Sequence, residues 1–192
     1  MGVAKPAMPV GEGTMVGAVI DVARSAGLDP VVVVTGFHRD EVAEAVGDTA
    51  SLVHNPEAAS GNMSSLLVGL GEIGDADITV VLLSDMPLVE ASTIEALCRE
   101  LVASEAMCGW TQYTDGRGHP IAFAPRGIEA IDTLSGTKAL WPFFDSLEDD
   151  ERYELFVDEA RPLDINTPAD YQNLTTQRSP ENGERKTENP PP

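Results

Sequence analysis

Residues 79–87 read Thr79-Val80-Val81-Leu82-Leu83-Ser84-Asp85-Met86-Pro87. Five apolar or β-branched residues in a row predict a strand buried on both faces, the kind found inside a parallel sheet. Asp85 then stands at the carboxyl end of that strand, where open α/β sheets bind their ligands. Its carboxylate is placed to hold a metal ion on a phosphate, and it is equally placed to cap the next turn. Both interpretations are open on this stretch alone.

Outward from this strand, extended apolar runs alternate with helical patterns. Residues 30–35 (PVVVVT) predict a second buried strand, and residues 13–27 predict a helix with Thr14 as its cap and Gly27 as its end. Residues 114–120 are expected to form a loop between two strands. Strands that alternate with helices predict a three-layer α/β domain with a mostly parallel sheet. Further helices are predicted over residues 40–46, 63–73, 92–103, 127–134, 138–147 and 168–174, and further strands over 50–54, 107–113, 121–123 and 153–157.

Length and composition indicate one domain followed by a tail. Residues 1–174 contain all the periodic segments, and a chain of 192 residues is long enough to bury a full core. From residue 175 to residue 192 no aliphatic or aromatic side chain occurs apart from proline, and this stretch is predicted to be a disordered acidic, Pro-rich tail.

The charge balance limits the partners of this chain. It has 32 acidic and 12 basic residues, a net charge of −20. Such a surface repels nucleic acid and anionic lipid, so neither is an expected partner. Salt screens self-repulsion of this kind, which leaves both a halophilic source and an ordinary acidic bacterial enzyme open. Cys98 and Cys108 predict free thiols, the apolar runs are only strand-length, and a cytoplasmic location is expected.

A set of short motifs resembles the molybdenum cofactor nucleotidyltransferase family, most closely its cytidylyltransferase branch. Each motif alone is weak, but they occur in the family's order at sensible spacing over residues 1 to about 174. They are Met1-Gly2 with Lys5 and Met8-Pro9, residues 29–36, Asn55-Pro56, Gly61-Asn62-Met63-Ser64-Ser65-Leu66, Ser84-Asp85-Met86-Pro87-Leu88-Val89, Gly118-His119-Pro120, and Leu163-Asp164-Ile165-Asn166-Thr167-Pro168.

The resemblance implies a Rossmann-like nucleotidyltransferase fold and transfer of CMP from CTP to molybdopterin. Negative charge then gathers around the α-phosphorus and the leaving pyrophosphate, and Mg²⁺ held by one or two carboxylates suits that charge. Asp85 and Asp164 are the implied metal ligands. Lys5, the only lysine before residue 138, is implied to act on the triphosphate, and Lys5 and Asp85 are the implied catalytic pair.

The resemblance also implies the residues around the nucleotide and the acceptor. The segment with Ser64 and Ser65 opens a helix and is on the cytidylyl side, although it is one serine shorter than the family's pattern and is preceded by Asn62. His119 is implied to face the pterin, and a molybdenum hydroxylase is an implied partner. The implied nucleotide- and acceptor-binding residues are Gly2, Lys5, Gly36, Asn55, Ser64, Ser65 and His119.

Three alternatives are open. The chain can be a nucleotidyltransferase of the same fold that uses GTP, a sugar phosphate or phospholactate. It can also be an inactive binding module, because no strand and only the end of the family's Gly-rich loop precede the first helix. A start assigned too late is the interpretation we prefer, since a sheet without its first strand leaves neighbouring strand edges unpaired.

Overall fold

The computed structural model describes residues 4–132 and 140–177. It confirms the α/β fold class, with helices and strands interleaved along the chain. The helices are η1 (Lys5–Ala7), α1 (Met15–Ser25), α2 (Arg39–Val46), η2 (Ala58–Ser60), α3 (Asn62–Ile73), α4 (Ala91–Ser104), α5 (Pro125–Asp132), α6 (Trp141–Asp145) and α7 (Pro168–Gln177). The strands are β1 (Pro9–Val10), β2 (Gly13–Thr14), β3 (Val32–Thr35), β4 (Ser51–His54), β5 (Thr79–Val81), β6 (Cys108–Tyr113), β7 (Gly116–Phe123) and β8 (Arg152–Phe156).

The strand pairing differs from the expected mostly parallel sheet. β3 and β4 form a parallel pair, whereas β5, β7, β6 and β8 form a second sheet in that order. In this second sheet β7 runs antiparallel to both β5 and β6, and β6 runs parallel to β8. The long hairpin of β6 and β7 produces this change, because a strand that returns directly to its neighbour must run antiparallel. Within the described residues β3 and β5 each have one strand neighbour.

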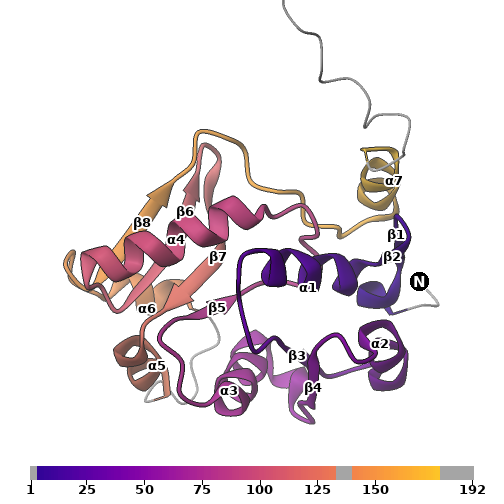
Figure 1. The fold of residues 1–192 in the computed structure, drawn as a ribbon, viewed down its shortest axis with the longest axis horizontal. Helices are drawn as coiled ribbons and strands as arrows, with labels where there is room; N and C mark the ends of the chain where they lie inside the picture. The colour runs from indigo at the N-terminus through magenta and orange to yellow at the C-terminus, as the bar shows by residue number, and fades with distance from the viewer. Residues whose placement is uncertain (1–3, 133–139, 178–192) are drawn as a thin grey trace, which may run out of the picture.

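The helices cover the strands on two sides, giving three layers (Figure 1). On one side, α1 and α2 pack on β3 and β4 through a cluster around Val16, Ile20 and Val33, and α4 packs on the larger sheet through Leu97 and Leu101. On the other side lie α3, α5 and α6. Because side chains of a strand alternate between its faces, Val33 faces α1 while Val34 touches Gly69 of α3.

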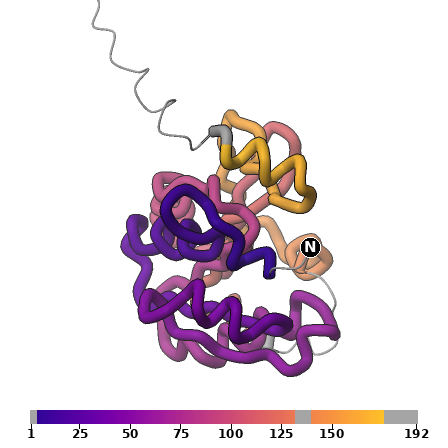
Figure 2. Tube along the Cα trace, turned by 90° about the vertical axis from the view of Figure 1, so that its right-hand side faces the viewer, coloured from indigo at the N-terminus to yellow at the C-terminus, as the bar shows by residue number. Residues whose placement is uncertain are grey.

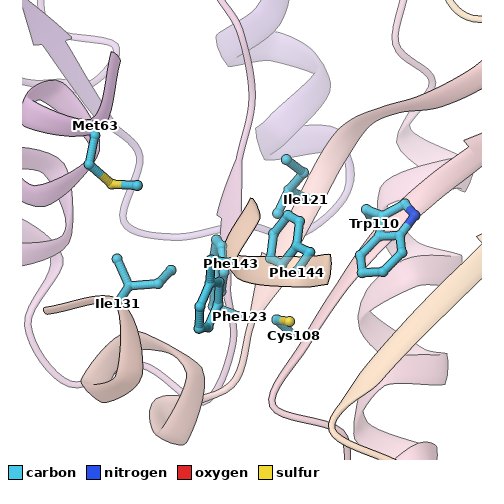
Figure 3. Packing of buried hydrophobic residues seen from close by; sticks show 8 residues of the cluster. All are labelled: Met63, Cys108, Trp110, Ile121, Phe123, Ile131, Phe143 and Phe144. Atoms are coloured by element: carbon cyan, nitrogen blue, oxygen red, sulfur yellow. The ribbon is translucent and has the colours of Figure 1, made fainter. Parts of the chain in front are cut away.

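Aromatic side chains fill the core beneath the larger sheet. Phe144 of α6 lies between Trp110 of β6 and Phe123 of β7, with ring centres 5.1 Å and 5.9 Å away (Figure 3). All three side chains are fully buried. Rings of this size bury a large apolar area, so this cluster anchors α6 to the sheet.

Several predicted elements are confirmed by their local chemistry. α1 begins after Thr14, whose hydroxyl accepts a hydrogen bond from Gly17 N, and it ends before Gly27 at a φ of 77°. The predicted strand over residues 79–84 is shorter, and the sequence around Asp85 is a turn. The final helix runs to Gln177, three residues past the predicted end of the domain, and the rest of the predicted tail lies outside the described residues.

One predicted loop is wrong. Residues 114–120 were expected to be a loop, but β7 begins at Gly116, so only two residues join β6 to β7. Trp110 pairs with Ile121 and Thr111 with Gly118, which leaves His119 and Pro120 as two extra residues in β7. This irregular bulge hid the strand from sequence analysis, since Pro and Gly are typical of loops.

The amino-terminal segment contacts both α7 and α2. From residue 4 onward it lies between α7 and the part of the chain that contains α2 and β4 (Figures 1 and 2). Tyr171 of α7 donates its hydroxyl hydrogen to Pro9 O at 2.6 Å, and Ala4 N donates to Glu41 Oε2 at 2.7 Å. Of the helices in the described part of the chain, none is long and apolar enough to cross a bilayer.

Candidate active site

Three distant segments meet at the turn after β5. Lys5, the first residue of η1, donates from Nζ to Asp85 Oδ2 at 2.7 Å and to Asn166 Oδ1 at 2.9 Å. The side chains of Lys5 and Asp85 are 32% and 26% exposed, so the pair is accessible from one side. The structure therefore brings together the two residues that the sequence suggests as a catalytic pair.

Asp164 lies next to Asp85. The backbone N–H of Ile165 donates to Asp85 O at 2.9 Å, which fixes the segment around Asp164 against the turn after β5. Partial burial, together with the negative charge of Asp85, raises the pKa of Asp164 above its usual value. Two negatively charged carboxylates that lie close together repel each other, and a cation bound between them would relieve this repulsion.

His119 lies in the bulge of β7 and is half-buried, whereas the sequence places it in a loop. Tyr113 Oη–H donates to its backbone oxygen at 2.8 Å. Burial lowers the pKa of His119 to about 4, against the opposing effect of the charge on Asp85. His119 is thus a neutral imidazole at neutral pH, close enough to Asp85 to sense its charge.

Asn55, Ser64 and Ser65 form one hydrogen-bonded cluster. Asn55 follows β4, is almost fully buried, and donates from Nδ2 to both serine hydroxyls at 2.9 Å. Ser64 Oγ–H is directed at the backbone oxygens of Glu57 and Gly61, at 3.0 Å and 2.8 Å. The cluster ties the end of β4 to the start of α3, and Ser64 is fully engaged within the protein.

Gly36 follows β3, and packing explains why it is a glycine. A Cβ on this residue would lie 2.1 Å from the Cβ of Ala58, so a side chain would push η2 away from the strand end. Gly2, the other glycine proposed from the sequence, lies outside the described residues.

The donor atoms at this site fit a hard divalent cation. Asp85 and Asp164 supply carboxylates and Asn166 an amide oxygen, which are ligands that Mg²⁺ and Mn²⁺ prefer. The part of the chain that the structure describes has no group of three or more His, Cys, Asp or Glu side chains arranged to hold a metal. A phosphate-bound Mg²⁺ needs only one or two protein carboxylates.

An open hollow lies elsewhere, at the amino-terminal ends of β3 and β4, next to Pro30 and Gly47. Asp85 lies beyond the carboxyl end of β5. The hollow therefore takes no part in the site, because ligands of open α/β sheets bind at the carboxyl ends of the strands.

Sequence reasoning missed two residues near this site. Asn166 accepts from Lys5, and Arg117 stands on β7 two residues before His119. Both lie inside or beside motifs noted in the sequence, 163–168 and 118–120. Their positions in or next to those motifs were the only available signal.

The α/β layers, with Lys5 of η1 paired to Asp85 just after β5, are those expected of a nucleotidyltransferase. A model of the MobA-like NTP transferase domain matches residues 1–151. The chain belongs to this family.

Solved structures agree with this assignment. Rv0371c of Mycobacterium tuberculosis, in a complex with manganese, is 30% identical with a TM-score of 0.75, over 91% of this chain and 93% of that one. A nucleotidyl transferase from Methanothermobacter thermautotroptrophicus is 24% identical, with a TM-score of 0.74, over 91% of this chain and 85% of that one, and shares the fold. Molybdopterin-guanine dinucleotide biosynthesis protein A of Archaeoglobus fulgidus shares the fold at 14% identity and a TM-score of 0.67, over 91% of this chain and 90% of that one.

Curated relatives match a shorter part of the chain. The bifunctional protein GlmU of Symbiobacterium thermophilum is 28% identical over 99 residues, which is 51% of this chain and 21% of that protein. The match thus spans about a fifth of the relative's length.

Proposed function

We propose that this protein is a molybdenum cofactor cytidylyltransferase, which transfers CMP from CTP to molybdopterin and releases pyrophosphate. The observation that carries the proposal is the meeting of Lys5, Asp85 and Asp164 at one strand end, with Lys5 Nζ 2.7 Å from Asp85 Oδ2. A phosphate oxygen of the acceptor forms a bond to the α-phosphorus of CTP while the bond to the pyrophosphate oxygen breaks. The step needs positioning and charge neutralisation rather than covalent help from the protein.

Asp85 and Asp164 are the residues that would hold Mg²⁺. Bound there, the cation would neutralise charge on the phosphate oxygens and orient them. A manganese complex of Rv0371c, a relative at 30% identity, supports a divalent cation in this fold.

Lys5 supplies the positive charge of the protein itself. In the substrate complex we expect its ammonium to contact oxygens of the triphosphate, because a flexible lysine acts as a mobile point charge. Asn166 holds the other side of the same ammonium at 2.9 Å, which limits where it can move.

Ser65, rather than Ser64, is the serine that we expect to contact a ligand. Its oxygen accepts from Asn55, and the described contacts leave its own hydroxyl hydrogen without an acceptor. The choice of CTP rests on the resemblance of residues 63–66 to the cytidylyltransferase pattern. The choice of molybdopterin rests on those residues together with Gly118-His119-Pro120. Gly36 and Asn55 shape the same region in this proposal, and Gly2 stays a proposed nucleotide-binding residue.

The test is release of pyrophosphate from CTP, with Mg²⁺ and molybdopterin present, compared with GTP. We expect turnover with CTP, and loss of turnover in Asp85→Asn. Asp75→Asn is the matched control, because Asp75 is exposed at the opposite end of β5. Turnover with GTP alone would overturn the choice of base, and absence of turnover with either nucleotide would overturn the function.

A further inference from the structure

Arg117 makes contacts that none of the roles assigned above explains. It lies on β7 between the turn of the hairpin and His119. Its guanidinium carbon is 4.9 Å from the ring centre of Trp110 and 5.9 Å from that of Trp141. Two indoles thus hold the planar group, while 34% of the side chain stays exposed.

Asp145 is the acidic partner of this arginine. Arg117 Nη1 donates to Asp145 Oδ1 at 2.5 Å, and the side chain of Asp145 is 57% exposed. An ion pair so open to water is weak, whereas an arginine held flat can bind a phosphate through two N–H groups. The contact with Asp145 can therefore be exchanged for a phosphate while the indoles keep the guanidinium in place.

A second arginine, Arg161, contacts the backbone of Arg117 and lies three residues before Asp164 in the sequence. Arg161 donates from Nη1 to the backbone oxygen of Arg117 at 3.4 Å, and from Nε to Asp115 Oδ2 at 3.3 Å. Its positive charge also acts on Asp164, opposing the effects of burial and of Asp85 on the pKa of that residue. Arg117 thus lies on the part of β7 that extends past the carboxyl end of β5, whereas Lys5 reaches the site from η1.

Cations are scarce in this protein, so their positions carry information. The chain has 12 basic residues against 32 acidic ones, and an anionic substrate approaching it meets a repulsive field. A reaction between two phosphate-bearing substrates brings two anions to Asp85 and Asp164. Lys5 serves one of them in the proposed function, and among the described residues Arg117 is a candidate partner for the other.

We propose that Arg117 binds the acceptor, and that the acceptor is a phosphate monoester whose phosphate replaces Asp145 on the guanidinium. That the bound phosphate belongs to the acceptor rests on the proposed function. Binding of phosphate by Arg117 does not depend on it. Arg117 positions the phosphate whose oxygen attacks the α-phosphorus, and Trp110 and Trp141 keep the guanidinium fixed for it.

The two indoles also provide the measurement, because Trp110 and Trp141 are the only tryptophans of the chain. The indole N–H signals are followed by NMR while inorganic phosphate is added. We expect saturable shifts in the wild type and binding at least about tenfold weaker in Arg117→Gln. Asp145→Asn keeps Arg117 and removes its competitor, so phosphate should bind several times more tightly. Arg99→Gln is the matched control, since Arg99 is exposed on α4 and pairs with Glu100.

Three outcomes would overturn the inference: no saturable shift in the wild type, equal phosphate binding in Arg117→Gln, or weaker binding in Asp145→Asn. None of these needs CTP or turnover, so failure here is distinct from failure of the proposed function. Where turnover with molybdopterin is measurable, Arg117→Gln should raise KM for the acceptor about tenfold or more and leave KM for CTP unchanged.

Discussion

The ammonium of Lys5 lies 2.7 Å from Oδ2 of Asp85, although 80 positions of sequence separate the two residues. Lys5 belongs to the segment before the first long helix, and Asp85 to the turn after β5. Asn166, just before α7, accepts from the same ammonium. The site therefore forms only when three distant parts of the chain pack against one another, so it depends on the correct folding of the whole domain.

Asn55→Ala should destabilise the protein by about 2–3 kcal/mol, because it removes the three hydrogen bonds of a buried amide at the junction of β4 and α3. Asn55 makes two hydrogen bonds to serines and accepts a third from Glu57 N at 2.9 Å. Urea unfolding measures the change. Asn62→Ala, at an exposed position of α3, is the control and should stay within about 0.5 kcal/mol. Equal effects of the two substitutions would show that the cluster contributes nothing special.

Two glycine-to-alanine substitutions should have opposite signs. In Gly127→Ala the new Cβ would lie 2.2 Å from the backbone oxygen of Met107, so strand and helix must separate, and we expect a loss of about 1–3 kcal/mol. In Gly71→Ala, on the exposed face of α3, the Cβ meets nothing within 4 Å, and helix propensity should add up to about 1 kcal/mol. Thermal unfolding distinguishes them, and a stabilised Gly127→Ala would contradict the packing described here.

His119 should make stability depend on pH between about 4 and 6.5. Its folded-state pKa of about 4 lies below the ordinary value of 6.5, so in this window the unfolded chain binds more protons at this residue. Stability from this source is complete above pH 6.5 and is lost as the pH falls toward 4, by at most about 1.4 kcal/mol per pH unit. Urea midpoints at several pH values, for the wild type and His119→Asn, isolate the contribution. An identical pH dependence in the two proteins would contradict a half-buried neutral imidazole at this position.

The two cysteines should differ in reactivity. Burial, reinforced by the charge of Glu151, raises the pKa of Cys108 to about 12, and its side chain is inaccessible in the core. Burial also raises the pKa of Cys98, which is partly exposed on α4. The thiolate is the reactive form, so iodoacetamide should modify Cys98 first and Cys108 only after unfolding. Mass spectrometry of the alkylated protein measures the order, and faster modification of Cys108 would mean that the core opens near β6.

Local sequence patterns predicted most helices and strands, since periodicity, caps and glycines act over a few residues. Thr14 and Gly27 bound α1 as their chemistry suggests. The strand order was beyond reach, because the antiparallel pairing of Thr79 with Phe123 depends on a contact between distant segments. The bulge at His119 and Pro120 also looked like a loop, since the residues that form it are typical of loops.

Motif resemblance pointed to Lys5, Asp85 and Asp164 as residues of the site, and the structure pairs Lys5 with Asp85 and holds the segment around Asp164 against the same turn. It pointed less clearly to the other residues. Asn55 and Ser64 are occupied with each other, a satisfied network that a list of polar residues cannot reveal. Arg117 was missed because its significance comes from the indoles and the carboxylate around it, which lie on other elements.

The most direct test of the central claim is Mn²⁺ binding in the presence of CTP, followed by electron paramagnetic resonance. Mn²⁺ shares the oxygen ligands of Mg²⁺ and has an observable signal. We expect one site in the wild type, binding weakened about tenfold or more in both Asp85→Asn and Asp164→Asn, and unchanged binding in Asp75→Asn. Wild-type affinity in the Asp85→Asn and Asp164→Asn proteins would contradict the assignment of the metal and nucleotide site to the end of β5.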